Sequence, residues 1–197
     1  MIKGDTIQLI PATPEDRLTA YQWLCQSDTT PYHMGPPHFP NHPVLTWEEF
    51  CQDYTEYYFD GSEPAKGRCF VIISQDTPVG IISYSCFHLK QHKAELDIWM
   101  NSLQNCGQGR GPDAIRTLCS YLHETLGISD FIIRPSARNP RAVKAYEKAG
   151  FVKINQAKKE ETLHEFLLDQ YYSLYGPGDY GSGDDVVLIK SLQPAPR

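Results

Sequence analysis

The chain of 197 residues carries no Lys or Arg between positions 18 and 65. It also lacks any run that approaches the ~18 consecutive apolar residues of a membrane-spanning helix. The first 17 residues contain no apolar core of a signal peptide. Its six cysteines form no CxxC pair and no Cys/His cluster at zinc spacing. We therefore expect a cytoplasmic protein with free thiols, no membrane partner and no metal.

The charge is negative overall and unevenly distributed. The formal charge is −6, from 18 Lys and Arg against 24 Asp and Glu. Residues 1–65 have a net charge of −8, residues 66–159 of +7 and residues 160–197 of −5. Nucleic-acid-binding proteins are basic, so we expect no such partner. The distribution favours a basic middle that holds an anionic ligand and acidic ends that meet a cationic one, although chance segregation on solvated faces would look the same.

Length and composition predict one packed domain, since 41% of the residues are hydrophobic. Alternating or continuous apolar runs predict strands at 6–12, 68–74, 79–87, 94–100, 130–135, 151–154 and 185–192. Capping signals and helical periodicity predict helices at 13–27, 46–59, 112–126, 139–150 and 160–175. Loops are expected at 28–45 and 176–183, and a turn at 75–78. Strands with helices between them in this order predict a mixed sheet.

The segment 94–100 (AELDIWM) alternates most regularly. Its apolar face holds Ala94, Leu96, Ile98 and Met100, and Glu95, Asp97 and Trp99 lie on the other face. The two carboxylates are two residues apart and therefore point the same way.

A glycine-rich turn, Leu103 to Pro112 (LQNCGQGRGP), follows this strand and precedes a helix. Alternating glycines leave successive backbone N–H groups free to point at one spot, and the helix dipole adds positive charge there. No Gly-Lys-Ser/Thr follows and the turn is not GxGxxG, so neither a Walker motif nor a dinucleotide fingerprint is present. The turn predicts a phosphate-binding cradle.

A second motif runs from Asn139 to Phe151 (NPRAVKAYEKAGF). Asn139 and Tyr146 are seven residues apart, two helical turns, and so share a face. Taken alone, Asn139 could be a helix cap and Tyr146 a packed aromatic side chain.

In their order and separation, these two motifs resemble those of the GNAT (GCN5-related) N-acetyltransferases. The family's acetyl-CoA motif, (Gln/Arg)-x-x-Gly-x-(Gly/Ala), is met in two registers: Gln104-x-x-Gly107-x-Gly109 and Cys106-x-x-Gly109-x-Gly111. We prefer the second because it puts the helix start directly after its last glycine, although Cys106 replaces the usual Gln or Arg. Within the family, residues 96–151 are most similar to the aminoglycoside 6′-N-acetyltransferases.

The resemblance implies one GNAT-like domain over residues 1–197, of the α/β (α+β) class, with a central mixed, mostly antiparallel sheet flanked by helices. Residues 66–154 would form the acetyl-CoA-binding core, 1–65 the acceptor side, and 155–197 the C-terminal helix and last strand. The implied co-substrate is acetyl-CoA, without a metal. The implied contacts to it are Trp99, Met100, Gly107, Gln108, Gly109, Arg110, Gly111, Asn139, Ala142 and Tyr146.

By the same resemblance, Asp97 takes the position of the family's catalytic aspartate and Tyr146 lies near the sulfur of the co-substrate. An ammonium must lose a proton before its nitrogen attacks a thioester, so a carboxylate base is needed. Asp97 is favoured, and Glu95 is the alternative base or a substrate anchor. Tyr146 would protonate the thiolate, because a phenol with a pKa of about 10 suits that role. A backbone N–H near residues 98–100 would meet the oxyanion.

The expected function is acetyl transfer from acetyl-CoA to a primary amine of a small, cationic, aminoglycoside-like acceptor, by a monomer or homodimer. Arg134 stands where such enzymes can carry an acid, and its charge would repel a polyamine unless it is turned away or paired. The alternatives are a protein, peptide or siderophore amine as acceptor, or a catalytically silent acyl-CoA-binding domain.

Overall fold

The computed structural model describes residues 1–33, 44–137, 139–171 and 186–193. The helices are α1 (Asp16–Cys25), α2 (Thr30–His33), α3 (Trp47–Asp53), α4 (Tyr57–Asp60), α5 (Arg110–Leu126), α6 (Pro140–Lys148) and α7 (Lys159–Phe166), with 3-10 turns η1 (Leu103–Asn105) and η2 (Gln156–Lys158). The strands are β1 (Ile2–Lys3), β2 (Gln8–Pro11), β3 (Gly67–Ser74), β4 (Thr77–Ser85), β5 (Lys93–Met100), β6 (Asp130–Ile133), β7 (Val152–Lys153) and β8 (Leu188–Ser191).

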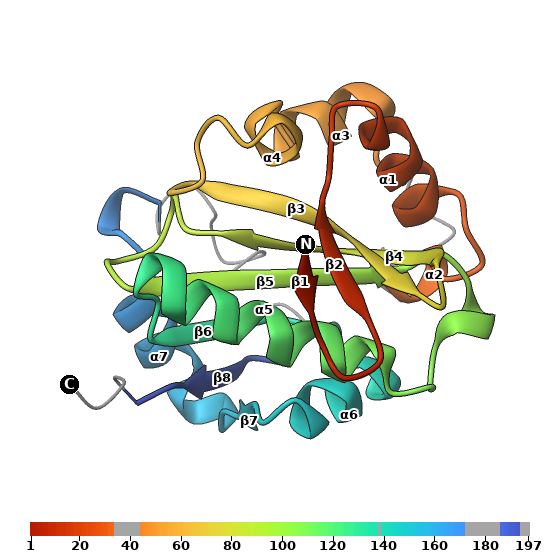
Figure 1. Ribbon diagram of the computed structural model, residues 1–197. Helices are drawn as coiled ribbons and strands as arrows, with labels where there is room; N and C mark the ends of the chain where they lie inside the picture. Colours follow the sequence, from red (N-terminus) through yellow and green to blue (C-terminus); the bar gives the residue numbers. More distant parts are fainter. Residues whose placement is uncertain (34–43, 138, 172–185, 194–197) are drawn as a thin grey trace.

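In the described part of the chain, all the strands form one sheet in the order β1-β2-β3-β4-β5-β6-β8-β7 (Figure 1). Every neighbouring pair is antiparallel except β5 and β6, which confirms the mixed, mostly antiparallel sheet. The parallel pairing joins only Lys93–Glu95 to Asp130–Ile132. Beyond Glu95, β5 is paired with β4 alone, so the two parallel strands separate.

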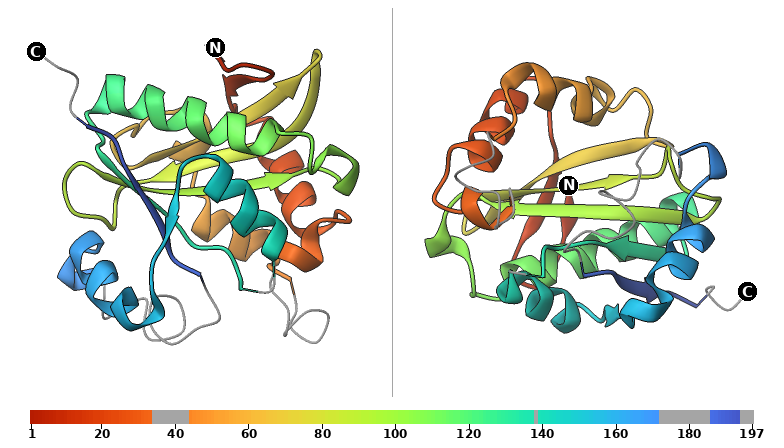
Figure 2. Two further views of the ribbon diagram at one scale, coloured as in Figure 1. Left: turned by 90° about the horizontal axis from the view of Figure 1, so that it is seen from below. Right: turned by 180° about the vertical axis from the view of Figure 1, so that it is seen from behind.

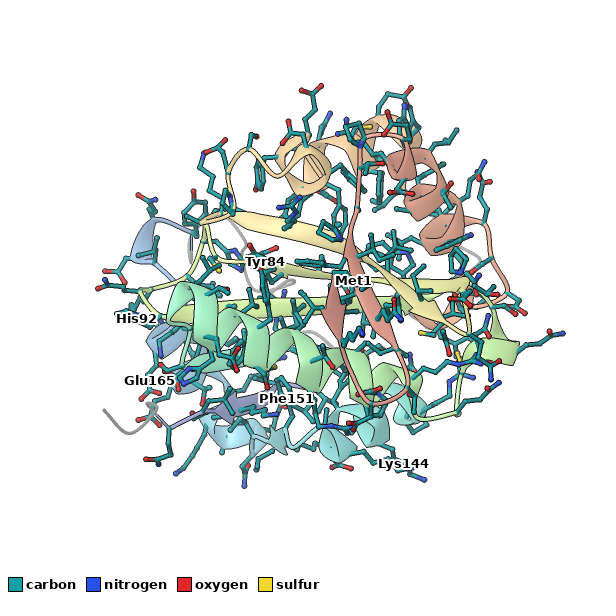
Figure 3. The ribbon with its side chains drawn as sticks, viewed as in Figure 1. Met1, Tyr84, His92, Lys144, Phe151 and Glu165 are labelled. Carbon is teal, nitrogen blue, oxygen red and sulfur yellow. The ribbon has the colours of Figure 1, made fainter. Side chains whose placement is uncertain are left out.

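Helices cover both faces of the sheet (Figure 2). On one face, α5 and α6 enclose a first apolar cluster that includes Leu96, Ile115 and Phe131. On the other face, α1, α3 and α4 enclose a second cluster that includes Phe50 and Trp99. Each buried apolar side chain of this size contributes about 1.5–3 kcal/mol relative to exposure. The alternation predicted for 94–100 is confirmed, because its four apolar residues lie in the first cluster and Trp99 lies in the second. Figure 3 shows Tyr84 inside the molecule, whereas Lys144 and Glu165 point outward.

Local capping signals account for several element ends. The capping box before α3 is present: Glu49 N–H donates to Thr46 Oγ1 (3.2 Å) and Thr46 N–H donates to Glu49 Oε2 (2.8 Å). Asn139 caps α6 by accepting from Ala142 N–H (3.1 Å). Gly127 ends α5 at φ 66° and Gly150 follows α6 at φ 91°, backbone values that favour glycine.

Two predicted helices are interrupted. The helix over 46–59 is split into α3 and α4 by residues 54–56. The helix over 160–175 is interrupted after Phe166, because extended Leu167 forms a bridge with Leu89. Residues 172–175 of that prediction lie outside the described residues.

Other differences are smaller. Helix α2 occupies part of the loop predicted at 28–45, whose residues 34–43 lie outside the described residues, as does the whole predicted loop 176–183. Strand β1 was not predicted, since two residues carry no periodicity. The turn between β3 and β4 consists of Gln75 and Asp76, both at positive φ, so Pro78 belongs to β4.

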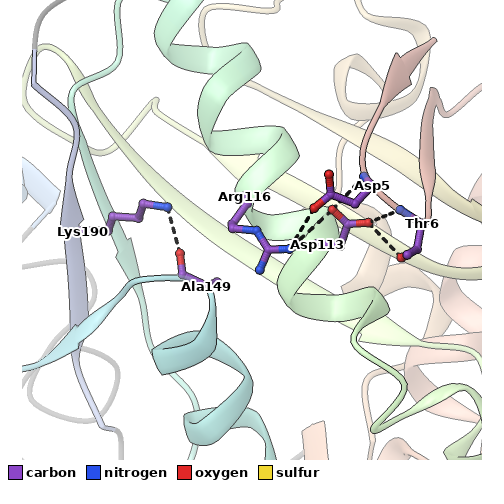
Figure 4. A network of polar contacts seen from close by, with 6 residues as sticks. All are labelled: Asp5, Thr6, Asp113, Arg116, Ala149 and Lys190. Atoms are coloured by element: carbon purple, nitrogen blue, oxygen red, sulfur yellow. Dashed lines mark hydrogen bonds and ion pairs between the residues drawn. The ribbon is translucent and has the colours of Figure 1, made fainter.

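The N-terminal hairpin is fastened to α5 through Asp113 (Figure 4). This buried carboxylate accepts from Asp5 N–H (3.1 Å), Thr6 N–H (2.6 Å) and Thr6 Oγ1 (2.9 Å), and Arg116 Nη2 lies 3.7 Å from it. Burial alone would raise the pKa of Asp113, but these donors outweigh it and lower the pKa below its usual value. The contacts hold the first turns of α5, which carry the glycine-rich sequence.

Candidate active site

Two cavities meet where β5 separates from β6. The first, of about 430 Å³, lies between β5, the turn before α5 and the inner face of α6. The second, of about 660 Å³, lies between β5, the α3–α4 corner and the end of β6. Among the described residues, the walls shared by both are formed by Tyr32, Ile98, Asn139, Ala142 and Tyr146. Groups bound in the two cavities can therefore meet at this junction.

The glycine-rich turn forms one wall of the first cavity. Gly107 (φ 77°) and Gly109 (φ 81°) have left-handed backbones, and a Cβ at either would meet no atom within 4 Å. Glycine is therefore needed for the backbone conformation rather than for space. Gly111 also lines the cavity, and the first N–H groups of the 17-residue α5 start here.

The reason for preferring the second glycine register is wrong. Helix α5 begins at Arg110, directly after Gly109, so Gly111 lies within its first turn. The N–H of Asp113 donates to Gly109 O, which closes that turn early. All three glycines line the cavity, so both registers remain open.

Two residues that we expected to contact the co-substrate, Gln108 and Arg110, have side chains that bond within the turn. Gln108 Nε2 donates to Gln104 O (2.6 Å), and Arg110 Nη1 donates to Asn105 Oδ1. Neither residue lines the first cavity. In this structure both side chains brace the turn itself.

Positive charge lines the same cavity from α6. Arg141, Lys144 and Lys148 are its only charged wall residues in the described part of the chain. Their spacing of three and four residues puts them on one helix face. The Arg141 guanidinium lies over the Tyr32 ring, 4.8 Å from its centroid. A glycine cradle at a helix start facing three cations fits an elongated ligand with several phosphates.

Trp99 and Met100 are adjacent in β5, and their side chains lie on opposite faces of the sheet. The Trp99 side chain is fully buried on the opposite face, where Nε1 donates to Ala20 O (3.2 Å). Its expected ligand contact is therefore limited to its backbone. Met100 lines the first cavity, and its carbonyl accepts from Thr29 Oγ1 (2.9 Å).

The α6 motif forms the junction. Asn139 donates from Nδ2 to Tyr32 O (3.3 Å) while its oxygen caps the helix, so both ends of its amide hold protein backbone. Tyr146 is 7% exposed. Burial, and then the Asp97 charge, raises the pKa of Tyr146 above its usual value. The phenol therefore carries its proton at neutral pH, and it is a weaker acid than the unshifted phenol expected from the sequence.

Asp97 faces the second cavity from β5. Its Oδ2 accepts from Tyr54 Oη (2.7 Å), and its Oδ1 accepts from the backbone N–H of Ile98 (2.8 Å). Both donors are neutral, so they orient the carboxylate without cancelling its charge. We expected the Ile98 N–H to be one of the candidates that meet an oxyanion. In this structure it donates to Asp97 Oδ1 instead.

Glu95 lines the same cavity but is enclosed. Its Oε1 accepts from Arg134 Nε (2.6 Å), and its Oε2 lies 2.7 Å from His88 Nε2. Burial alone would raise the pKa of Glu95, but Arg134 and His88 outweigh it and hold the pKa at about 2. A carboxylate with that proton affinity is a weak base. Arg134 is therefore paired, as a cationic ligand would require.

Sequence reasoning brought together Asp97, Glu95, Asn139 and Tyr146, and missed Tyr32, Tyr54 and His88. The missed residues come from a one-turn helix, a helix break and a strand end, none of which has a periodic signal. Tertiary contacts alone place them.

Within the described residues, no three His, Cys, Asp or Glu side chains gather as metal ligands would. No helix in that part of the chain has both the length and the apolar character required to cross a membrane.

Several solved structures share the fold. The chain superimposes on aminoglycoside acetyltransferase AAC(6')-Ib in complex with coenzyme A with a TM-score of 0.64 at 17% identity, covering 96% of each chain. For spermidine N-acetyltransferase from Vibrio cholerae, with CoA and spermine, the TM-score is 0.62 at 18% identity, covering 94% of this chain and 95% of that one. For the Microcin C7 self immunity acetyltransferase MccE, with acetyl-CoA and AMP, it is 0.62 at 17% identity, covering 95% and 93%.

Sequence comparison gives the family. A search of curated proteins finds no significant match. The family model described as "Acetyltransferase (GNAT) domain" matches residues 6–152, which is most of the chain. The chain therefore belongs to the GNAT family of acetyltransferases, N-acetyltransferases that take acetyl-CoA as their acetyl donor.

Proposed function

We propose that this enzyme transfers the acetyl group to a primary amine of a small, cationic, aminoglycoside-like acceptor bound in the second cavity. The supporting observation is the charge on either side of the junction. The charged walls of the first cavity are cationic only, within the described residues. The second cavity carries Asp53, Glu95 and Asp97, and the Arg134 and His88 side chains that also line it both contact Glu95.

These charges refine the expectation drawn from the segment charges. The cations of the first cavity come from the basic middle, as expected. In the described residues, Asp53 is the acidic-end contribution to the second cavity, whereas Glu95 and Asp97 come from the basic middle. The acceptor site thus depends on where two carboxylates are placed more than on segment charge.

The proposed chemistry uses groups on both sides of the junction. Acetyl-CoA supplies a thioester carbonyl that is open to attack. Asp97 accepts a proton from the acceptor ammonium, directly or through water, which frees the nitrogen lone pair. The nitrogen then bonds to the carbonyl carbon, the C–S bond breaks, and Tyr146 donates its phenolic proton to the departing sulfur. The second proton of the nitrogen passes, directly or through water, to the Tyr146 phenolate and restores it. The cavities hold the two reactants against one another, which lowers the entropic part of the barrier.

Glu95 has a different part in this proposal. Held by Arg134 and His88, it neutralises Arg134 beside the acceptor and leaves proton transfer to Asp97. Roles for Gly107, Gly109, Gly111, Met100 and Ala142 as cofactor contacts, and for Gln108, Arg110 and Trp99 through their backbones, belong to the same proposal.

The test is thiol release from acetyl-CoA by the purified protein against a panel of aminoglycosides, linear polyamines, peptides and a neutral amine. We expect release with aminoglycosides, and a KM for the acceptor that rises with ionic strength because the attraction is electrostatic. Release with peptides and none with any polycationic amine would overturn the proposed acceptor class. No release with any amine, together with tight acetyl-CoA binding, would favour a silent binding domain.

A further inference from the structure

The break between α3 and α4 places one side chain over the base of the proposed reaction. Sequence periodicity predicts a continuous helix here, but Tyr54 follows α3 with φ −107° and ψ 74°. This conformation turns the Tyr54 side chain onto β5, where its hydroxyl donates to Asp97 Oδ2 (2.7 Å). Helical periodicity through Tyr54 would not by itself have placed this side chain against Asp97.

Tyr54 is held on several sides. Its ring stacks on Phe50 (centroids 4.9 Å apart) and meets the edge of Trp99 (5.4 Å) and the Tyr58 ring (5.4 Å). These aromatic contacts fix the ring plane and so the direction of the hydroxyl.

The Tyr54 backbone is fixed as well. Arg17 Nη2 donates to Tyr54 O (2.7 Å) and to Cys51 O (3.0 Å), and Arg17 Nε also reaches Tyr54 O (3.2 Å). Arg17 and Lys3 are the only basic residues, Lys or Arg, in positions 1–65. The guanidinium thus satisfies carbonyls that the end of α3 leaves open.

We propose that Tyr54 is a positioning residue for the acetyl transfer: its hydroxyl holds Asp97 Oδ2 and orients the carboxylate toward the acceptor amine, while Arg17 holds Tyr54 in place. The inference rests on the proposed function for the role of Asp97. Burial and the Asp97 charge raise the pKa of Tyr54, so its hydroxyl remains a donor throughout the working range.

Other side chains besides Tyr54 lie near Asp97, and each is a candidate to hold the carboxylate. Cys69 on β3 and Tyr146 on α6 both lie close enough for the Asp97 charge to raise the pKa of each. Glu95, on the same face of β5, is engaged by Arg134 and His88. Among these groups, Tyr54 alone has a hydrogen bond to the Asp97 side chain from a neighbouring element.

The experiment compares Tyr54→Phe with the wild type and with a matched control, Tyr84→Phe. The first variant keeps the ring contacts and loses one hydroxyl. The control also loses one buried hydroxyl, which donates to Pro64 O, and Tyr84 lines neither cavity. Thermal unfolding confirms that all three proteins are folded.

The first readout needs no substrate. In the ligand-free protein at one fixed pH, carboxyl-carbon NMR follows the chemical shift of the Asp97 carboxylate, which responds to the hydrogen bond that this group accepts. We expect this chemical shift to change in Tyr54→Phe and to keep its wild-type value in Tyr84→Phe. An unchanged chemical shift in Tyr54→Phe would overturn the inference, whatever the enzyme acetylates.

The second readout is activity on the best amine of the panel. In Tyr54→Phe we expect kcat to fall about tenfold. In the Asp97→Asn background the same change should have an effect smaller than twofold, because Tyr54 acts through Asp97. Equal losses in both backgrounds would overturn the inference. A changed Asp97 chemical shift without activity on any amine would instead count against the proposed function alone.

Discussion

Arg134 Nε lies 2.6 Å from Glu95 Oε1, inside the wall of the second cavity. This pairing changes the role that we expect for each of the two residues. Arg134 is the residue that most directly opposed a cationic acceptor, and Glu95 is the alternative base two residues from Asp97. Bound to each other, with His88 on the other carboxylate oxygen, they form a structural ion pair beside the reacting groups. Another carboxylate of the same cavity, Asp97, accepts from two neutral donors, Tyr54 Oη and Ile98 N–H.

The Glu95 pair predicts a pH dependence of stability. The folded pKa of Glu95 is about 2, against 4.5 for a free side chain. The folded state therefore binds fewer protons than the unfolded state between these values, so the contribution is fully present above about pH 5 and is lost as the pH falls toward about 2. The difference corresponds to roughly 3 kcal/mol as an upper value.

Glu95→Gln tests this contribution by chemical unfolding from pH 7 to pH 2. The free-energy difference from the wild type should be largest at pH 7 and shrink by up to about 3 kcal/mol toward pH 2. A difference that stays constant with pH would show that the charge on Glu95 does not stabilise the fold.

The cations of α6 predict how strongly the acetyl donor binds. Lys144 and Lys148 both line the first cavity. Replacing both with Ala should raise the KM for acetyl-CoA about tenfold at low salt, with kcat changed less than twofold, and the penalty should shrink as salt is added. Lys153→Ala is the matched control, since this exposed lysine on β7 lines neither cavity. A double variant with an unchanged KM would remove these lysines from the donor site.

Much of this arrangement follows from local sequence signals. Alternation over 94–100 assigned each β5 side chain to its face, and the Thr46–Glu49 box and Gly127 mark helix ends through contacts with near neighbours. Such interactions span a few residues, so sequence patterns carry them.

The rest depends on partners far along the chain. The break at Tyr54 is held by Arg17, 37 residues away, and α7 is interrupted where Leu167 pairs with Leu89. Gln108 and Arg110 lie at variable positions of the glycine motif and were expected to contact the co-substrate, yet their side chains bond to Gln104 and Asn105. A motif predicts where the backbone lies better than where long side chains point, because neighbouring polar groups compete for them.

Tyr146→Phe tests the proposed proton donor. The phenol lies at the junction and carries its proton at neutral pH. Removing the hydroxyl should lower kcat about 100-fold and leave the acetyl-CoA dissociation constant within about threefold, because the hydroxyl acts on the departing sulfur and not on the phosphates.

Tyr121→Phe is the control for this variant. Tyr121 is a half-buried α5 residue that packs against Phe70 and lines neither cavity. Its substitution should leave kcat unchanged. If Tyr146→Phe turned over as fast as Tyr121→Phe, the leaving sulfur would take its proton from elsewhere.

The central claim is that Asp97 takes the proton from the acceptor amine. The most direct measurement is kcat/KM of Asp97→Asn with the preferred amine, alongside calorimetric binding of acetyl-CoA. Asn keeps the size and can still accept from Tyr54, but it is not a base at this pH. The account predicts a loss of at least about 100-fold in kcat/KM with an acetyl-CoA dissociation constant within about twofold of the wild type. Turnover equal to that of the wild type would contradict it.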